Sequence, residues 1–255
     1  MTTQASPDDA HAEAVQSGRA EARTLTEILK VDHGQLLQHV LPSAPADLRD
    51  AAQEAGSLGI LTRMQTIGAA LQSHLTHDAC VELTRHPSDT VRGWGWFALA
   101  AAHRAEKPGA LIRIMRPAAD DPHFGVREWA WMAIRPALAE QLHASLHALA
   151  ELTGDPSERI RRFASETLRP RGVWAKRIDT LKTDPDLGLV ILEPLRSDPS
   201  RYVQDSVANW INDASKTRPD WAIALAERWR LESPTPPTER IVSRGLRSLR
   251  RHSGD

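Results

Sequence analysis

Cysteine is almost absent from this 255-residue sequence, because Cys80 is the only one. A single cysteine excludes an internal disulfide framework and a metal site built from several cysteines. No apolar run approaches the ~20 residues of a membrane helix, and the polar segment from Met1 to Gly18 lacks the apolar stretch of a signal peptide. These absences predict a soluble protein of a reducing compartment, with a cytoplasmic location.

Motifs for common catalytic and cofactor chemistries are also missing. The sequence has no phosphate-binding glycine loop, no nucleophile elbow and no HExxH. His143 and His147 have the i, i+4 spacing of metal ligands, but a third ligand does not accompany them on this leucine-rich stretch. We therefore predict neither a metal nor a cofactor.

The net charge is close to zero, but the charges are unevenly distributed. Residues 1–60 carry 4 basic and 9 acidic side chains, and the remaining 195 carry 28 and 24. The arginines of the basic part are clustered, which permits a polyanionic partner without requiring one. Tryptophan is unusually abundant among the aromatic residues, with 8 Trp against 1 Tyr and 3 Phe.

A degenerate repeat occupies the larger part of the chain. Each copy begins with a proline, usually after aspartate, and has an aliphatic residue four positions later that starts an apolar stripe of helical spacing. A proline is tolerated in the first turn of a helix, and a neighbouring Asp or Ser caps it. The prolines are spaced by 35, 34, 43 and 38 residues and are Pro87, Pro122, Pro156, Pro199 and Pro237.

Further helical stretches, such as 109–116, 142–152 and 187–195, lie between these helices, and no segment has the alternation of a strand. Two helices per repeat predict an all-α fold, a HEAT-like repeat solenoid of antiparallel helix pairs. We expect a disordered tail over 1–22, a capping region of about three helices over 23–85, and the repeats over 86–251 in one continuous domain with that region. The proline-anchored helices should stack in parallel as its inner layer.

The helix faces opposite the apolar stripe carry arginines and carboxylates. Counted from each proline, position +5 is Arg92, Arg127 and Arg161, and position +13 is Arg135 and Arg169. Positions +6, +10 and +14 share one helix face, since steps of four residues do so. That face holds Glu128, Glu166, Asp205 and Asp213. Two interpretations stay open, a solvated face and a functional surface.

The tryptophans divide by their helical phase. Trp94, Trp129 and Trp210 lie near the apolar stripe and are expected in the core, whereas Trp96 and Trp131, both at +9, are candidate surface platforms for stacking. Trp174 lies in the break after Pro170. The helices of the second and third repeats should end at the +14 prolines, Pro136 and Pro170, while the fourth helix runs on and carries Asp213 at its end.

Two motifs resemble the bacterial DNA alkylation-repair glycosylases with HEAT-like repeats, and the AlkC branch more than its AlkD relatives. They read SERIRRFASETLRPRGVWAKRI from Ser157 and DPSRYVQDSVANWINDASKTRPDW from Asp198. The similarity is specific through 121–230 and looser over 23–120. Many members carry a further immunoglobulin-like domain, which we do not expect in a chain ending at Asp255. Thr167 and the pair Gly172–Val173 depart from the family pattern.

The resemblance implies excision of cationic N-methylated bases from duplex DNA. The family acts chiefly on 3-methyladenine, and parts of the AlkC branch accept 1-methyladenine or 3-methylcytosine. By the same resemblance and the stripe together, the catalytic residues are Asp213, Glu166 and Glu128, and Trp174 contacts the lesion or sugar. The expected DNA-binding residues are Arg127, Arg161, Arg169, Arg171 and Lys176.

We expect a monomer whose partner is double-stranded DNA containing alkylated bases, without a membrane. The alternative is a non-catalytic HEAT-like module that binds DNA or another protein. Retention of the acidic residues together with Trp174 favours the enzyme, because a pure binder has no reason to keep carboxylates facing a polyanion.

Overall fold

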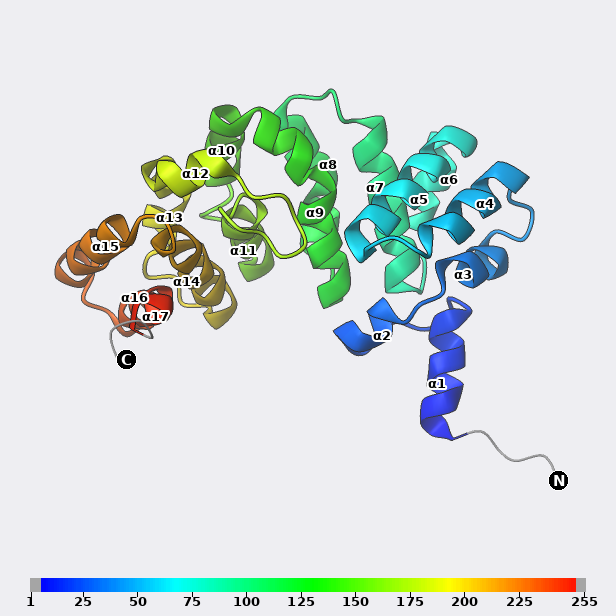
Figure 1. Ribbon diagram of the computed structural model, residues 1–255, viewed down its shortest axis with the longest axis horizontal. Helices are drawn as coiled ribbons and strands as arrows, with labels where there is room; N and C mark the ends of the chain where they lie inside the picture. Colours follow the sequence, from blue (N-terminus) through cyan, green and yellow to red (C-terminus); the bar gives the residue numbers. More distant parts are fainter. Residues whose placement is uncertain (1–5, 251–255) are drawn as a thin grey trace. The chain divides into compact units, whose positions relative to one another are not determined.

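The computed structural model describes residues 6–250, and this range is helical without a β-strand (Figure 1). The all-α prediction is confirmed. Two compact units make up the chain. The first comprises the residues up to Arg104 together with Asp121–Ala133, and the second comprises Ala105–Asp120 and the residues from Ile134 onward.

The first unit is built from seven helices and the first part of an eighth. They are α1 (Pro7–Gln16), α2 (Leu25–Leu29), α3 (His33–Val40), α4 (Ala46–Ala55), α5 (Ile60–His74), α6 (His77–Leu83), α7 (Asp89–Ala102) and residues 124–133 of α9 (Phe124–Glu140). The capping region 23–85 therefore has five helices instead of the expected three. Pro42, Pro45, Gly56 and Gly59 lie in the breaks that divide it.

The second unit contains the remaining helices. They are α8 (Pro108–Ala119), the end of α9, α10 (Leu142–Ala150), α11 (Glu158–Thr167), α12 (Asp179–Thr183), the 3-10 helix η1 (Pro185–Gly188), α13 (Leu189–Leu195), α14 (Arg201–Ser215), α15 (Pro219–Glu232), α16 (Pro236–Gly245) and α17 (Arg247–Arg250). Helices α8, α10 and α13 confirm the expected helical stretches between the anchored helices.

The segment 1–22 was expected to be disordered, and the structure corrects this for its described part. A capping box starts α1, because the Ser6 side chain accepts from Asp9 N and the Asp9 side chain accepts from Ser6 N. After α1, the backbone of Ala22 is held on both sides: its N–H donates to Asp89 (3.0 Å), and its carbonyl accepts from His123 Nε2 (2.7 Å). Residues 1–5 lie outside the described part of the chain.

The helix starts in the repeats share one construction. Three of the anchored helices, α7, α11 and α14, begin two residues after their proline, and a serine between the two caps them. The aspartate before the proline accepts from the capping residue's N–H, as Asp155 does from Ser157 (2.9 Å) and Asp198 from Ser200 (2.8 Å). The proline therefore precedes the cap and lies two residues before the first helical residue, outside the expected first turn.

Helices α11, α14 and α16 of the second unit stack in parallel, as predicted. Ser200, which caps α14, donates to Glu158 at the start of α11. Ser165 donates to Ser206 further along (2.8 Å), and Arg169 reaches Asp213 at the C-terminal ends. Along α14 the contacts advance in the same order, from Asp205 with Arg240 of α16 to Asn209 with Arg247, the first residue of α17. Because both contact series run from N- to C-terminus together, neighbouring helices point the same way.

Helix α9 does not end at Pro136, as the sequence analysis expected, but continues to Glu140. A proline inside a helix removes one backbone hydrogen bond. Ile134 and Leu138, on either side of it, are buried in the core, and this burial offsets the loss. The other expectations hold: α11 ends before Pro170, and α14 runs through Asp213 to Ser215.

Candidate active site

The arginines at position +5 hold the repeats together. Arg161 donates through Nη1 to the carbonyls of Asp155 (2.8 Å) and Pro156 (3.1 Å), which form its own helix-start turn. Its Nε and Nη2 bind Asp198, the aspartate before the next proline, at 2.6 and 3.1 Å. Arg161 is thus a structural bracket between two consecutive turns.

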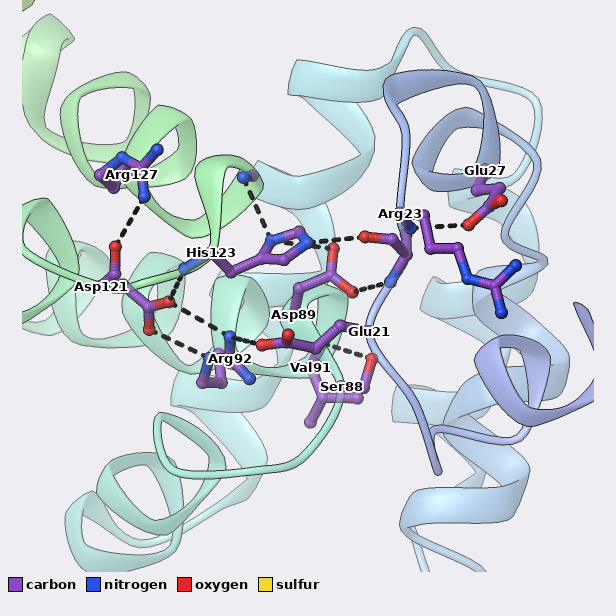
Figure 2. Close-up of polar contacts among 12 residues, drawn as sticks. Glu21, Arg23, Glu27, Ser88, Asp89, Val91, Arg92, Asp121, His123 and Arg127 are labelled. Atoms are coloured by element: carbon purple, nitrogen blue, oxygen red, sulfur yellow. Dashed lines mark hydrogen bonds and ion pairs between the residues drawn. The ribbon is translucent and has the colours of Figure 1, made fainter. Parts of the chain in front are cut away.

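The first unit repeats this arrangement (Figure 2). Arg92 donates to the carbonyls of its own turn and to both oxygens of Asp121, and it also binds Glu21. Arg127 donates through Nη1 to the carbonyls of Asp121 and Pro122, both at 2.8 Å. Arg127 and Arg161, two of the residues expected to contact DNA, therefore donate hydrogen bonds to acceptors within the protein.

Two predicted catalytic carboxylates, Glu166 of α11 and Asp213 of α14, are brought together by one arginine. Arg169 Nη1 donates to Glu166 Oε1 at 2.6 Å, while Nε and Nη2 donate to Asp213 Oδ2 at 3.0 and 2.8 Å. All three side chains are buried. Arg169, expected at the DNA phosphates, is instead the link between the two carboxylates.

Glu166 is embedded in hydrogen bonds and positive charge. Ser206 donates to its second oxygen (2.7 Å), and Arg162 lies 3.6 Å from the same oxygen. Burial acts to raise the pKa of Glu166, but the nearby Arg162 and Arg169 charges and the Ser206 bond outweigh it and hold the pKa below its ordinary value. Glu166 is therefore ionised at neutral pH.

Asp213 is electrostatically different from Glu166. Burial raises its pKa above the ordinary aspartate value, and Arg169 only partly offsets this. Its Oδ1 is 3.7 Å from Lys216 Nζ, and its carbonyl accepts from Arg171 Nε (3.2 Å). Two carboxylates whose pKa values are moved in opposite directions are typical of catalytic sites.

Trp174 lies in the loop 168–178, which starts directly after α11. The loop is closed by a hydrogen bond from Ile178 N to Pro170 O (3.1 Å). Trp174 has φ of 56°, the one non-glycine residue with positive φ in the described chain, and it is 46% exposed. A bulky residue in this conformation is strained. Arg169 and Arg171 of the same loop contact Asp213, so the strained and exposed indole is a candidate ligand contact. Lys176 of this loop is also exposed.

The third predicted carboxylate, Glu128, belongs to the first unit. It is half-buried, and its Oε2 accepts from Trp131 Nε1 at 2.9 Å. Trp131 and Trp96 are buried, so the prediction that they are surface platforms is wrong. Position +9 turns inward here because nearly all of α7 and much of α9 are buried, not only one stripe. The core assignment of Trp94, Trp129 and Trp210 is confirmed.

A row of arginines beside α14 was missed by the sequence analysis. Arg240 and Arg244 both bind Asp205 Oδ1, at 2.8 and 2.9 Å, and Arg247 binds Asn209 at 2.8 Å. Asp205 is thus shared by two arginines, and Arg247 lies further along the same side of α14, against Asn209. The signal was present as arginines at i, i+4 and i+7 of the last repeat. Next along α14, Ser248 donates to Asn212 (2.9 Å), the neighbour of Asp213.

Other kinds of site find little support. In residues 6–250, no three side chains of His, Cys, Asp or Glu are grouped to hold a metal ion, and none of the helices there is long and apolar enough to cross a membrane. Cys80 is buried, and His143 and His147 are exposed.

No family model matches the sequence. YhaZ of Bacillus subtilis (strain 168), an uncharacterized protein, is 40% identical over 117 residues, which are 46% of this chain and 32% of YhaZ. The chain therefore spans about a third of the length of that relative.

A structural match comes from the Pseudomonas fluorescens alkylpurine DNA glycosylase AlkC, solved bound to DNA containing an abasic site analog. The TM-score is 0.70 at 28% identity, and the match covers 91% of this chain and 66% of AlkC. The resemblance predicted from the two motifs is confirmed: the protein has the HEAT-like fold of an AlkC-type alkylpurine DNA glycosylase.

Proposed function

We propose that this protein is a DNA glycosylase that excises cationic N-methylated bases from duplex DNA, with 3-methyladenine as its main substrate and 1-methyladenine or 3-methylcytosine as further candidates. The observation behind the proposal is the pair of buried carboxylates, Glu166 and Asp213, joined by Arg169, whose loop also carries the exposed Trp174. The structural similarity of the protein to AlkC supports the same class of reaction.

The chemistry of these lesions suits a site of carboxylates without a general acid. An N3-methylated purine is already cationic, so it leaves as a neutral base without protonation. Positive charge develops on the deoxyribose as the glycosidic bond breaks, as in glycoside hydrolysis. A fixed carboxylate stabilises that charge and orients the attacking water.

We propose that Asp213 stabilises the sugar cation and orients the attacking water, because Arg169 binds only its Oδ2. The other oxygen faces Lys216 at 3.7 Å, beyond hydrogen-bond distance. Glu166 supports it by holding Arg169 and by adding negative charge. The Trp174 indole is proposed to lie against the cationic base or the sugar, since the face of an indole attracts cations. Glu128, which belongs to the first unit, stays a prediction of the family resemblance as a supporting carboxylate.

We propose that cationic side chains near Asp213 contact the DNA phosphates. Lys176 is exposed, and Arg171 is half-buried in the Trp174 loop. The row Arg240, Arg244 and Arg247 extends the positive surface along α14. Arg127, Arg161 and Arg169 are proposed to act structurally, because their guanidinium groups bind carbonyls or carboxylates of the protein.

The test is base release from a duplex methylated to carry 3-methyladenine, 7-methylguanine, 1-methyladenine and 3-methylcytosine. Released bases are separated by chromatography, and the unmethylated duplex is the control. We expect release of 3-methyladenine and none from the control. Binding to the duplex without release of any base would contradict the proposal and favour the non-catalytic DNA-binding module.

A further inference from the structure

Arg135, near the end of α9, is a buried cation in the second unit. Only 3% of the residue is exposed. Its three hydrogen bonds all go to neutral backbone carbonyls: Nη1 donates to Thr167 O (2.7 Å), and Nη2 donates to Arg169 O (2.7 Å) and Lys176 O (3.1 Å). Burying a charge without a carboxylate at bonding distance is costly. We therefore looked for a structural role of the Arg135 charge itself.

The three acceptors show what Arg135 connects. Thr167 is the last residue of α11, so its carbonyl has no partner within the helix, and a cation there satisfies it. Arg169 is the residue that binds Glu166 and Asp213. Lys176 lies in the second half of the Trp174 loop, after the tryptophan. One guanidinium therefore joins the helix end, the carboxylate cluster and the far side of the loop.

The loop is shaped around this guanidinium. A Cβ placed on Gly172 would lie 3.3 Å from Arg135 Cζ and 3.2 Å from Ala175 Cβ, closer than ordinary packing. The backbone of the loop thus lies directly against Arg135. Between the Gly172 and Lys176 contacts stands Trp174, whose φ of 56° must be imposed by its surroundings.

The carboxylates Glu166 and Asp213 help to keep the Arg135 guanidinium charged. Burial and the Arg169 charge lower its pKa to about 10, while Glu166 and Asp213 act in the opposite direction. The side chain is therefore cationic at neutral pH. Lysine cannot replace it, because a single ammonium group does not offer the planar fork that reaches several carbonyls at once.

We propose that Arg135 is a positioning residue, which fixes the loop 168–178 and so holds Trp174 in its strained backbone conformation, in the same loop as Arg169. This rests on the proposed function only for its effect on base release. Arg135 itself touches neither base nor sugar in this account.

The first experiment measures the loop directly in the folded, full-length protein. Trypsin cleaves after Arg171, Lys176 and Arg177, which all lie in the loop. In Arg135→Lys we expect native-state cleavage at these sites to accelerate by at least about tenfold, since local opening governs such cleavage. The control is Leu149→Ala in α10, a buried position outside the loop whose truncation lowers global stability. Equal cleavage rates in Arg135→Lys and wild type would overturn the proposal, whatever the protein does to DNA.

The second experiment is a double-mutant cycle on single-turnover base release. If Arg135 acts through Trp174, Arg135→Lys and Trp174→Ala each lower the rate, and the double variant is no slower than Trp174→Ala alone. Losses that multiply would show that Arg135 does not act through the indole. Absence of base release by wild type would refute the proposed function, while the cleavage result would still decide whether Arg135 holds the loop. Should Arg135→Lys not fold, Gly172→Ala tests the same contact, with faster cleavage expected.

Discussion

Arg169 binds a single oxygen of Asp213 with two of its nitrogens, at 3.0 and 2.8 Å, and holds Glu166 with the third, at 2.6 Å. The two carboxylates come from successive repeats, 47 residues apart in the chain. Their mutual repulsion is offset by one cation, and one Asp213 oxygen is left outside the Arg169 pair. The arginine thus makes a buried pair of carboxylates possible and leaves Asp213 Oδ1 without a bond to Arg169.

Replacing Arg169 with methionine should destabilise the protein strongly. The change leaves two buried carboxylates without their common partner, and breaking a buried ion pair in this way costs about 3–5 kcal/mol. We expect the free energy of unfolding at pH 7, measured in urea, to fall by that amount. The loss should shrink in acid, where protonation removes the unpaired charges. A decrease below about 1 kcal/mol would contradict the buried cluster.

The pH dependence of excision should report the raised pKa of Asp213. The ionised form is the one that stabilises a sugar cation, so the single-turnover rate should fall on the acidic side at a pH above the ordinary aspartate value. Glu166 remains ionised in this range, because its pKa is lowered. An acidic limb at or below the ordinary aspartate value would assign the titration to another group.

The same two shifts affect folding in opposite directions. Glu166 contributes stability above its unfolded pKa, and this contribution is lost as the pH falls through its lowered folded pKa. The raised pKa of Asp213 favours its protonated form in the folded protein, so its contribution is lost as the pH rises through the folded pKa. Asp213→Asn is therefore expected to cost less stability than Glu166→Gln at pH 7.

Salt dependence should separate surface arginines from structural ones. Arg244→Gln in α16 removes a partly exposed cation, so the slope of log K against log salt for DNA binding should fall by about 0.9 if it contacts one phosphate. Arg230→Gln is the matched control, since Arg230 pairs with Glu239 on the side of α15. Arg161→Gln should leave the slope unchanged and lower stability, because buried Asp198 loses its partner. Equal slopes for all four proteins would place α16 outside the DNA interface.

Trp174→Gly should separate stability from activity. Glycine adopts positive φ without strain, and the indole it removes is half-exposed. The midpoint of thermal unfolding should therefore stay constant or rise, while base release falls. Trp221→Phe in α15, a buried tryptophan whose Nε1 binds Asp186, serves as a contrast with lower stability and unchanged release. A large drop in thermal stability for Trp174→Gly would show that the indole is a packing residue.

The sequence predicted features that depend on local pattern. The proline-anchored helices, their parallel stacking in the second unit and the approach of Glu166 to Asp213 follow from a helical period and a fixed repeat. The N-terminal helix α1 was missed although its capping box, Ser6 with Asp9, is a local signal. The contacts that hold the segment after α1 are distant, because Asp89 of α7 and His123, just before α9, bind the backbone of Ala22. No local signal reveals such partners.

The roles of the arginines also depended on tertiary contacts. Position +5 looked like an exposed, basic face, yet Arg92 and Arg161 bind the aspartate of the following repeat. Pairing this position with the aspartate before the next proline would have identified the bracket. For Arg135, the carbonyl partners belong to a loop without regular structure, so no spacing rule predicts them.

The central claim is that Asp213 acts on charge that develops only during bond cleavage. The most direct test is single-turnover release of 3-methyladenine by wild type and Asp213→Asn, together with the affinity of each for undamaged duplex. We predict a rate lower by ~10²-fold or more with affinity unchanged or slightly increased, because the lost interaction exists only in the transition state and an anion near phosphates repels them. Wild-type release by both Asp213→Asn and Glu166→Gln would contradict the account and reduce the cluster to a structural ion pair.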